Sequence, residues 1–174
     1  AFLERTDITE HHKKLATTVF SALPASCASN IRTFSIIYKD AKYRGLGGKS
    51  TIILDGSVND TEFTALLIHE CGHVISGNMD GSSRSGESAF RDGKSPFYND
   101  GAAASFFALS WENERTLKKG TKDADFISGY ASSDIFEDFA ETFAAYVLQR
   151  PYLRTRAETN KAIAQKLAWM EANI

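Results

Sequence analysis

Apolar residues recur at helical spacing in five stretches of the chain. In the most regular stretch, Ile135, Phe139 and Phe143 are four positions apart, so they share one face of a helix. Pro151 follows this stretch closely and supports its end, because proline interrupts helical hydrogen bonding. The pattern predicts helices over 8–23, 61–76, 106–119, 134–149 and 154–172.

Two short stretches rich in β-forming residues predict strands instead. They cover 34–38 and 50–54, and Asp55-Gly56 closes the second of them. Between the two stretches, the run Gly45-Leu46-Gly47-Gly48 has the composition of a turn. The chain is therefore expected to place one small sheet among several helices, which is typical of the α+β class.

The segment 77–101 is rich in glycine, serine, aspartate and asparagine, which indicates a long surface insertion rather than a linker. Its oxygen-bearing turns would suit a structural calcium ion, but the ordered ligand pattern of a calcium loop is missing. A plain surface excursion is therefore the expectation. With 174 residues, of which 43% are hydrophobic, the chain is expected to form a single domain over 1–174.

Composition excludes several classes of function. The formal net charge of −2 gives no basic surface of the kind that binds nucleic acid. No apolar run approaches the roughly 20 residues that cross a bilayer. The two cysteines, Cys27 and Cys71, suit either one disulfide or two small buried apolar residues, and the sequence leaves both open. No feature indicates an oligomeric state.

The strongest chemical signal is His69-Glu70-Cys71-Gly72-His73, inside the second predicted helix. Residues four positions apart lie on one helix face, so both imidazoles can reach one ion. Zn²⁺ accepts such nitrogen ligands in a roughly tetrahedral arrangement. Glu70 stands next to the first ligand, where its carboxylate can take a proton from a water on the metal. The alternative is a helix whose histidines bond to polar neighbours, which the rarity of the motif disfavours.

A catalytic zinc takes three protein ligands, so a third is expected elsewhere in the chain. Glu137 and Glu141 are four positions apart in the predicted helix 134–149, close to its apolar stripe. Buried acids need partners, and a metal ion or a metal-bound histidine is such a partner. Spacing alone does not separate the two acids. The alternatives are a helix-capping role for Glu137 and a solvated charge for Glu141.

The His-Glu-x-x-His motif, followed by Tyr130, Glu137 and Glu141, resembles the metallopeptidase domain of the anthrax lethal factor family. The Pro-Pro endopeptidases are the more similar branch, through the glycine-rich run at 45–48 and the acidic helix. The resemblance covers roughly residues 45–148. It implies a zincin-like, more narrowly gluzincin-like, fold that is mostly helical, with a small sheet next to the motif helix.

The resemblance further implies a zinc-dependent endopeptidase that hydrolyses peptide bonds of protein substrates through a zinc-bound water. The implied ligands of its one zinc ion are His69, His73 and Glu137. Glu141 would accept an imidazole N–H and so orient a ligand. Glu70 would carry the proton of the water to the leaving amine. The phenol of Tyr130 would stabilise the oxyanion of the tetrahedral intermediate.

The peptide substrate is expected to add as an extended strand to an edge of the sheet. The residues assigned to that edge are Ser50, Thr51, Ile52, Ile53 and Leu54. Two rival functions remain: a catalytically silent zinc-containing binding or adhesion module, and another zinc hydrolase such as an exopeptidase. A structural zinc ion usually has four protein ligands, most of them cysteines, whereas this sequence offers only three ligands. The resemblance, together with Ala1 in place of an initial methionine, predicts a secreted protein.

Overall fold

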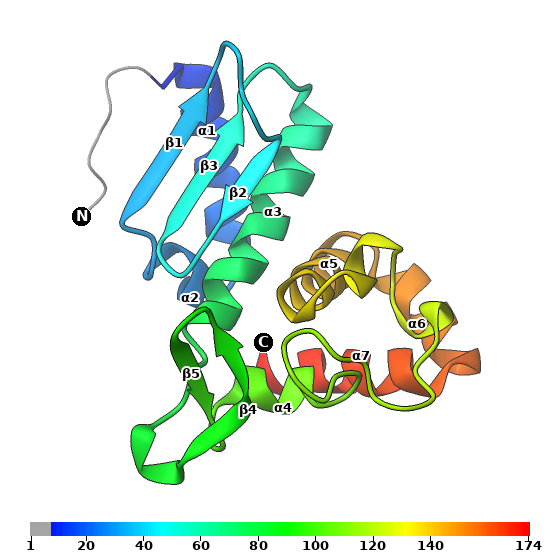
Figure 1. Cartoon of the computed structure of the whole chain (residues 1–174). Coiled ribbons are helices and arrows are strands. Elements are labelled where there is room, and N and C mark those ends of the chain that lie inside the picture. The colour runs from blue at the N-terminus through cyan, green and yellow to red at the C-terminus, as the bar shows by residue number, and fades with distance from the viewer. Residues whose placement is uncertain (1–7) are drawn as a thin grey trace. The chain divides into compact units, whose positions relative to one another are not determined.

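The computed structural model describes residues 8–174, which form two compact units that divide between Asn78 and Met79 (Figure 1). Helices predominate, and the strands form one three-stranded sheet and one two-stranded sheet. The predicted α+β class is thereby confirmed, whereas a single domain over 1–174 remains a prediction. Among the described residues, no helix is both long and apolar enough to cross a bilayer.

The first unit packs helices against the three-stranded sheet. Its elements are α1 (Glu10–Ala22), α2 (Ala25–Ala28), β1 (Thr33–Ile37), β2 (Gly45–Gly47), β3 (Thr51–Asp55) and α3 (Asp60–Gly77). The strand order is β1-β3-β2, with β1 parallel and β2 antiparallel to β3. Helix α3 packs against β2 and β3, and α1 packs against α3 (Figure 1). Ile52 and Leu54 alternate along β3 and are almost fully buried, so the central strand anchors this core.

The glycine-rich run predicted as a turn is strand β2. Across the ladder Gly45 pairs with Leu54, and Gly47 pairs with Ile52. The sequence pattern missed this strand because glycine has no side chain to pack on a pleated surface and is depleted in strands. The contact that β2 makes with α3 offsets the low strand propensity of glycine, and a sequence pattern does not reveal that contact.

The second unit gathers helices around an aromatic core. Its elements are β4 (Glu87–Asp92), β5 (Ser95–Tyr98), α4 (Ala102–Phe107), α5 (Ile135–Leu148), α6 (Arg150–Thr159) and α7 (Lys161–Asn173). Short 3-10 turns lie at Ser83–Ser85, Asp123–Asp125 and Tyr130–Ser132. Phe106, Phe107 and Phe139 are fully buried, and their rings meet edge to face. The strongly periodic helix predicted over 134–149 is confirmed as α5.

Two other predicted helices were wrong in extent. Helix α4 ends at Phe107, well before the predicted end at 119. Within the remaining stretch, the Asn113 side chain accepts hydrogen bonds from two backbone N–H groups downstream, which form a turn. The predicted helix 154–172 is broken into α6 and α7 at Asn160. The Asn160 side chain accepts from the N–H of Ile163, so it caps the start of α7.

The predicted surface insertion 77–101 contains a β-hairpin with a buried side. β4 and β5 pair antiparallel, and Phe90 and Phe97 are only 4% and 3% exposed. Both rings contact Phe107 edge to face. The segment therefore supplies part of the core of the second unit, in addition to the exposed turns that its composition predicted.

The two cysteines form a disulfide, which decides between the two alternatives that the sequence left. Cys27 lies in α2 and Cys71 lies in α3, 44 positions apart in the chain, and both are fully buried. A crosslink across such a long loop restricts the unfolded chain and so favours the folded state. It also ties the motif helix to α2.

Reduction of this disulfide should lower the free energy of unfolding by about 3 kcal/mol. Urea denaturation with and without a reductant measures the change. The doubly substituted Cys27→Ala, Cys71→Ala protein is the control, because it should match the reduced protein and should not respond to the reductant. Equal unfolding midpoints for the oxidised and reduced protein would contradict the expectation.

Candidate metal centre

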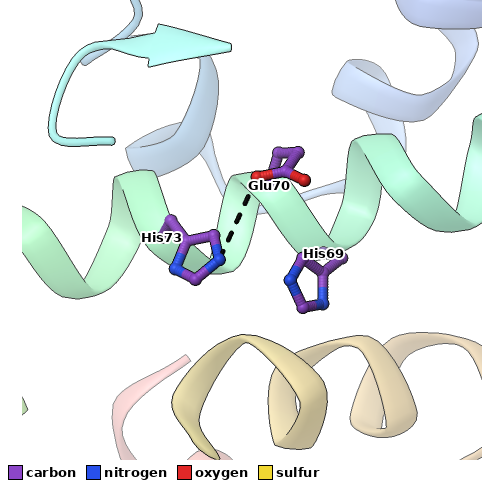
Figure 2. Close-up of side chains that lie close together, drawn as sticks. All are labelled: His69, Glu70 and His73. Carbon is purple, nitrogen blue, oxygen red and sulfur yellow. Dashed lines mark ion pairs between the residues drawn. The ribbon is translucent and has the colours of Figure 1, made fainter. Parts of the chain in front are cut away.

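Helix α3 carries His69, Glu70 and His73 in its second half, and the sequence defines both ends of the helix. The Asn59 side chain caps the first turn by accepting from the N–H of Glu62, at 3.0 Å. The two imidazoles lie one helical turn apart on the same side of the helix, as Figure 2 shows. Their rings meet edge to face with centroids 4.9 Å apart.

The three side chains converge closely enough to bind one ion. A ligand atom of each of His69, Glu70 and His73 lies within 4.8 Å of the others. Nε2 of His73 is 4.0 Å from Oε2 of Glu70 (Figure 2). Ligand atoms around a tetrahedral zinc with bonds of ~2.1 Å lie roughly 3.4 Å apart, so the spacing of these side chains is of the same order. Imidazole nitrogens are donors that zinc prefers, and the Glu70 carboxylate beside them is a potential proton acceptor.

Glu70 is buried beside the histidines. Its side chain is 5% exposed, and that of His73 is 13% exposed. A carboxylate held in such a position is well placed to exchange a proton with a water in the site. The structure thus brings together the first three residues that the sequence predicted for the site.

In the second unit, Tyr130 and Glu137 form a direct hydrogen bond. The Tyr130 hydroxyl donates to Oε1 of Glu137 over 2.9 Å, and the tyrosine is 58% exposed. Glu137 lies in the first turn of α5, where the Asp134 side chain caps the helix. The side chain that caps this helix is that of Asp134, whereas the carboxylate of Glu137 accepts the hydrogen bond from Tyr130.

Glu141 has a partner that the sequence did not reveal. Oγ of Ser128 donates to Oε2 of Glu141 over 2.6 Å and accepts from the N–H of Ala131 over 3.0 Å. Ser128 therefore links the turn that carries Tyr130 to α5. A serine in a loop gave no pattern that could have identified this role.

The assignment of the substrate-binding edge to 50–54 was wrong. β3 is the central strand, paired with β1 on one side and β2 on the other, so its backbone groups are occupied by the sheet. Ser50 precedes β3, and its carbonyl accepts from the N–H groups of Arg32 and Thr33. The difference follows from β2, which covers the outer side of β3 where the sequence predicts a turn.

Strand β2 forms an edge of this sheet. The carbonyl of Arg44 accepts from the N–H of Asp55, and the N–H of Gly48 donates to the carbonyl of Thr51. In an antiparallel ladder, alternate residues direct both backbone groups to the partner strand. By that alternation, Gly45 and Gly47 direct their N–H and C=O groups away from β3, toward the outer edge of the sheet.

A buried ion pair joins α5 to α7 through Asp138, which follows Glu137, and no sequence pattern indicated it. Nζ of Lys166 is 2.7 Å from Oδ1 of Asp138, and both side chains are completely buried. Trp111 Nε1 donates to Oδ2 of the same carboxylate over 3.0 Å. Burial raises the pKa of Asp138 and lowers that of Lys166, while the attraction between the two charges opposes both shifts.

Each group of predicted residues is thus assembled within its own unit. His69, Glu70 and His73 lie on α3, whereas Tyr130, Glu137 and Glu141 lie on α5 and the turn that precedes it. Comparison with models of known protein families gives no match to this chain, and comparison with curated proteins gives no match either.

Proposed function

We propose that the protein is a zinc-dependent endopeptidase with a zincin-like fold, similar to the lethal factor family and its Pro-Pro endopeptidase branch. The observation that carries the proposal is the convergence of His69, Glu70 and His73 on one buried stretch of α3, within 4.8 Å of one another. The motif helix also packs against an edge strand, which supplies backbone groups for an extended peptide.

In this proposal, His69 and His73 are two protein ligands of one zinc ion and Glu137 is the third. Glu141 accepts an imidazole N–H and fixes the orientation of that ring. Bound zinc would polarise the scissile carbonyl and lower the pKa of a water molecule toward neutrality. A carboxylate as third ligand fits the donor chemistry of catalytic zinc sites, which use three protein ligands.

The remaining steps belong to residues of the chain. The peptide pairs with the backbone of Gly45 and Gly47 at the outer edge of β2, which holds its scissile bond extended. Glu70 accepts a proton from the attacking water and delivers it to the departing amine. Tyr130 donates a hydrogen bond to the oxyanion as it develops.

The metal centre is tested by His73→Ala. We expect the native protein to bind about one zinc per chain, as a single catalytic site requires. The variant should bind zinc at least ~100-fold more weakly. Loss of a residue that only hydrogen-bonds to a metal ligand already lowers metal affinity by about 10–100-fold, and His73 is a proposed ligand itself. Competition with a chromogenic chelator measures the affinity. His11→Ala is the matched control: His11 lies in α1, is exposed and pairs with Asp60 at the start of α3, so its loss should leave zinc affinity unchanged.

Digestion of a peptide library by the zinc-loaded protein separates the rival functions. Cleavage within peptides whose two termini are blocked supports the endopeptidase. Cleavage that requires a free terminus would indicate an exopeptidase. Zinc binding without cleavage would indicate a catalytically silent binding or adhesion module. We further propose that the protein is secreted, since a disulfide persists in oxidising compartments.

A further inference from the structure

Strand β2 crosses directly over the carboxylate of Glu70. A methyl group added at Gly45 would overlap Oε1 of Glu70 and lie 3.0 Å from its Cδ. A methyl group at Gly47 would lie 2.5 Å from Oε2 and 3.0 Å from the backbone oxygen of Glu70. Residues two apart in a strand face the same side, so both glycines present only hydrogen atoms to this carboxylate.

Backbone conformation does not explain the two glycines. A positive φ is costly for residues other than glycine. Among the described glycines it occurs at Gly81, Gly86, Gly93 and Gly120. Gly45 and Gly47 have φ values open to any residue, and glycine inside a strand weakens it. Close approach to Glu70 is the feature that accounts for both of them. The next glycine, Gly48, differs, because an added methyl would meet nothing within 4 Å.

We propose that Gly45 and Gly47 are positioning residues for Glu70. They let the edge strand lie against the carboxylate, so that the strand itself limits where the carboxylate can move. The same two residues direct their N–H and C=O groups to the outer edge, where the proposed substrate pairs. In this way β2 fixes the position of the Glu70 carboxylate and also the position of the peptide backbone that pairs with it. The catalytic part of this proposal rests on the proposed function, whereas the contact itself does not.

Gly45→Ala tests the catalytic part. The nearest atoms to its methyl belong to the flexible end of the Glu70 side chain, so the carboxylate should shift and the fold should persist. A misplacement of about 1 Å can lower a rate ~100-fold, and we expect kcat to fall by about that factor. KM should change less than about twofold, because alanine keeps both backbone groups that pair with a peptide. Gly48→Ala is the matched control and should keep kcat.

A stability cycle tests the contact without any reference to activity. Gly45→Ala should lower the urea midpoint of the native protein. In a Glu70→Ala background the same substitution should leave the midpoint unchanged or raise it, since the obstructing carboxylate is gone and alanine suits a strand better than glycine. An equal decrease in both backgrounds would overturn the proposal, as would an unchanged kcat in Gly45→Ala. If the native protein cleaves no peptide, the proposed function fails, and the cycle still decides the contact.

Discussion

Glu70→Gln should reduce peptide cleavage by about 10³-fold while zinc remains bound, because general-base catalysis contributes about that factor. Glutamine has the same shape as glutamate, so it fits beneath Gly45 and Gly47 without the displacement that an added methyl causes. It cannot accept a proton from water at neutral pH. The two histidines are unaltered, so the metal affinity should stay within a few-fold of the native value.

The measurement pairs kcat/KM on a cleaved library peptide with zinc content after gel filtration. Glu62→Gln is the matched control, because Glu62 lies in the first turn of the same helix and forms a partly exposed ion pair with Arg44. That control should keep full activity. Undiminished cleavage by Glu70→Gln would reject the role of Glu70, and loss of zinc from this variant would show that the carboxylate acts as a ligand instead.

The parts of the fold that the sequence predicted well are those set by local signals. Asn59 and Gly77 mark the two ends of α3, and the regular apolar stripe of α5 defined that helix. The motif residues His69 and His73 were predictable for the same reason, since spacing on a helix fixes their common face. Local periodicity therefore recovered the helix that carries the candidate site.

The parts that the sequence could not predict depend on contacts between distant segments. The glycines of β2 predict a turn, but the structure requires them because they lie against the side chain of Glu70, more than twenty positions away in the sequence. That error moved the expected substrate edge to β3. Ser128 was not predicted because its role exists only through Glu141 and the N–H of Ala131. Such pairings leave no periodic trace in the sequence.

The buried pair of Asp138 and Lys166 is the plainest example of this limit. Both are charged residues, and a lysine in the last helix would ordinarily be expected on the surface. In the structure its Nζ lies 2.7 Å from Asp138 and 4.1 Å from the ring centroid of Phe126. It also donates to the carbonyl of Asp125 over 3.1 Å. The pair fastens α7 to the helix that carries Glu137.

Lys166→Met should therefore destabilise the protein by about 4 kcal/mol, because it leaves the buried charge of Asp138 without its partner. Methionine occupies a similar volume, so the loss reports the charge rather than a cavity. Simultaneous Asp138→Leu and Lys166→Met should recover most of that loss, since an apolar pair can replace a buried ion pair at little cost. Urea denaturation measures both variants.

The effect of Lys166→Met should also depend on pH in a definite direction. Burial already raises the pKa of Asp138, and loss of Lys166 removes the attraction that opposes that rise. An acid whose pKa is higher in the folded than in the unfolded state makes the folded state lose stability as pH rises through the interval between the two values. The free energy of unfolding of the variant should therefore be closest to that of the native protein near pH 4 and fall furthest below it at pH 8.

Arg154→Met, which removes an exposed charge paired with Glu171, is the control and should show neither the loss nor the pH dependence. A loss in Lys166→Met that is the same at both pH values would show that the buried charge of Asp138 is not its cause.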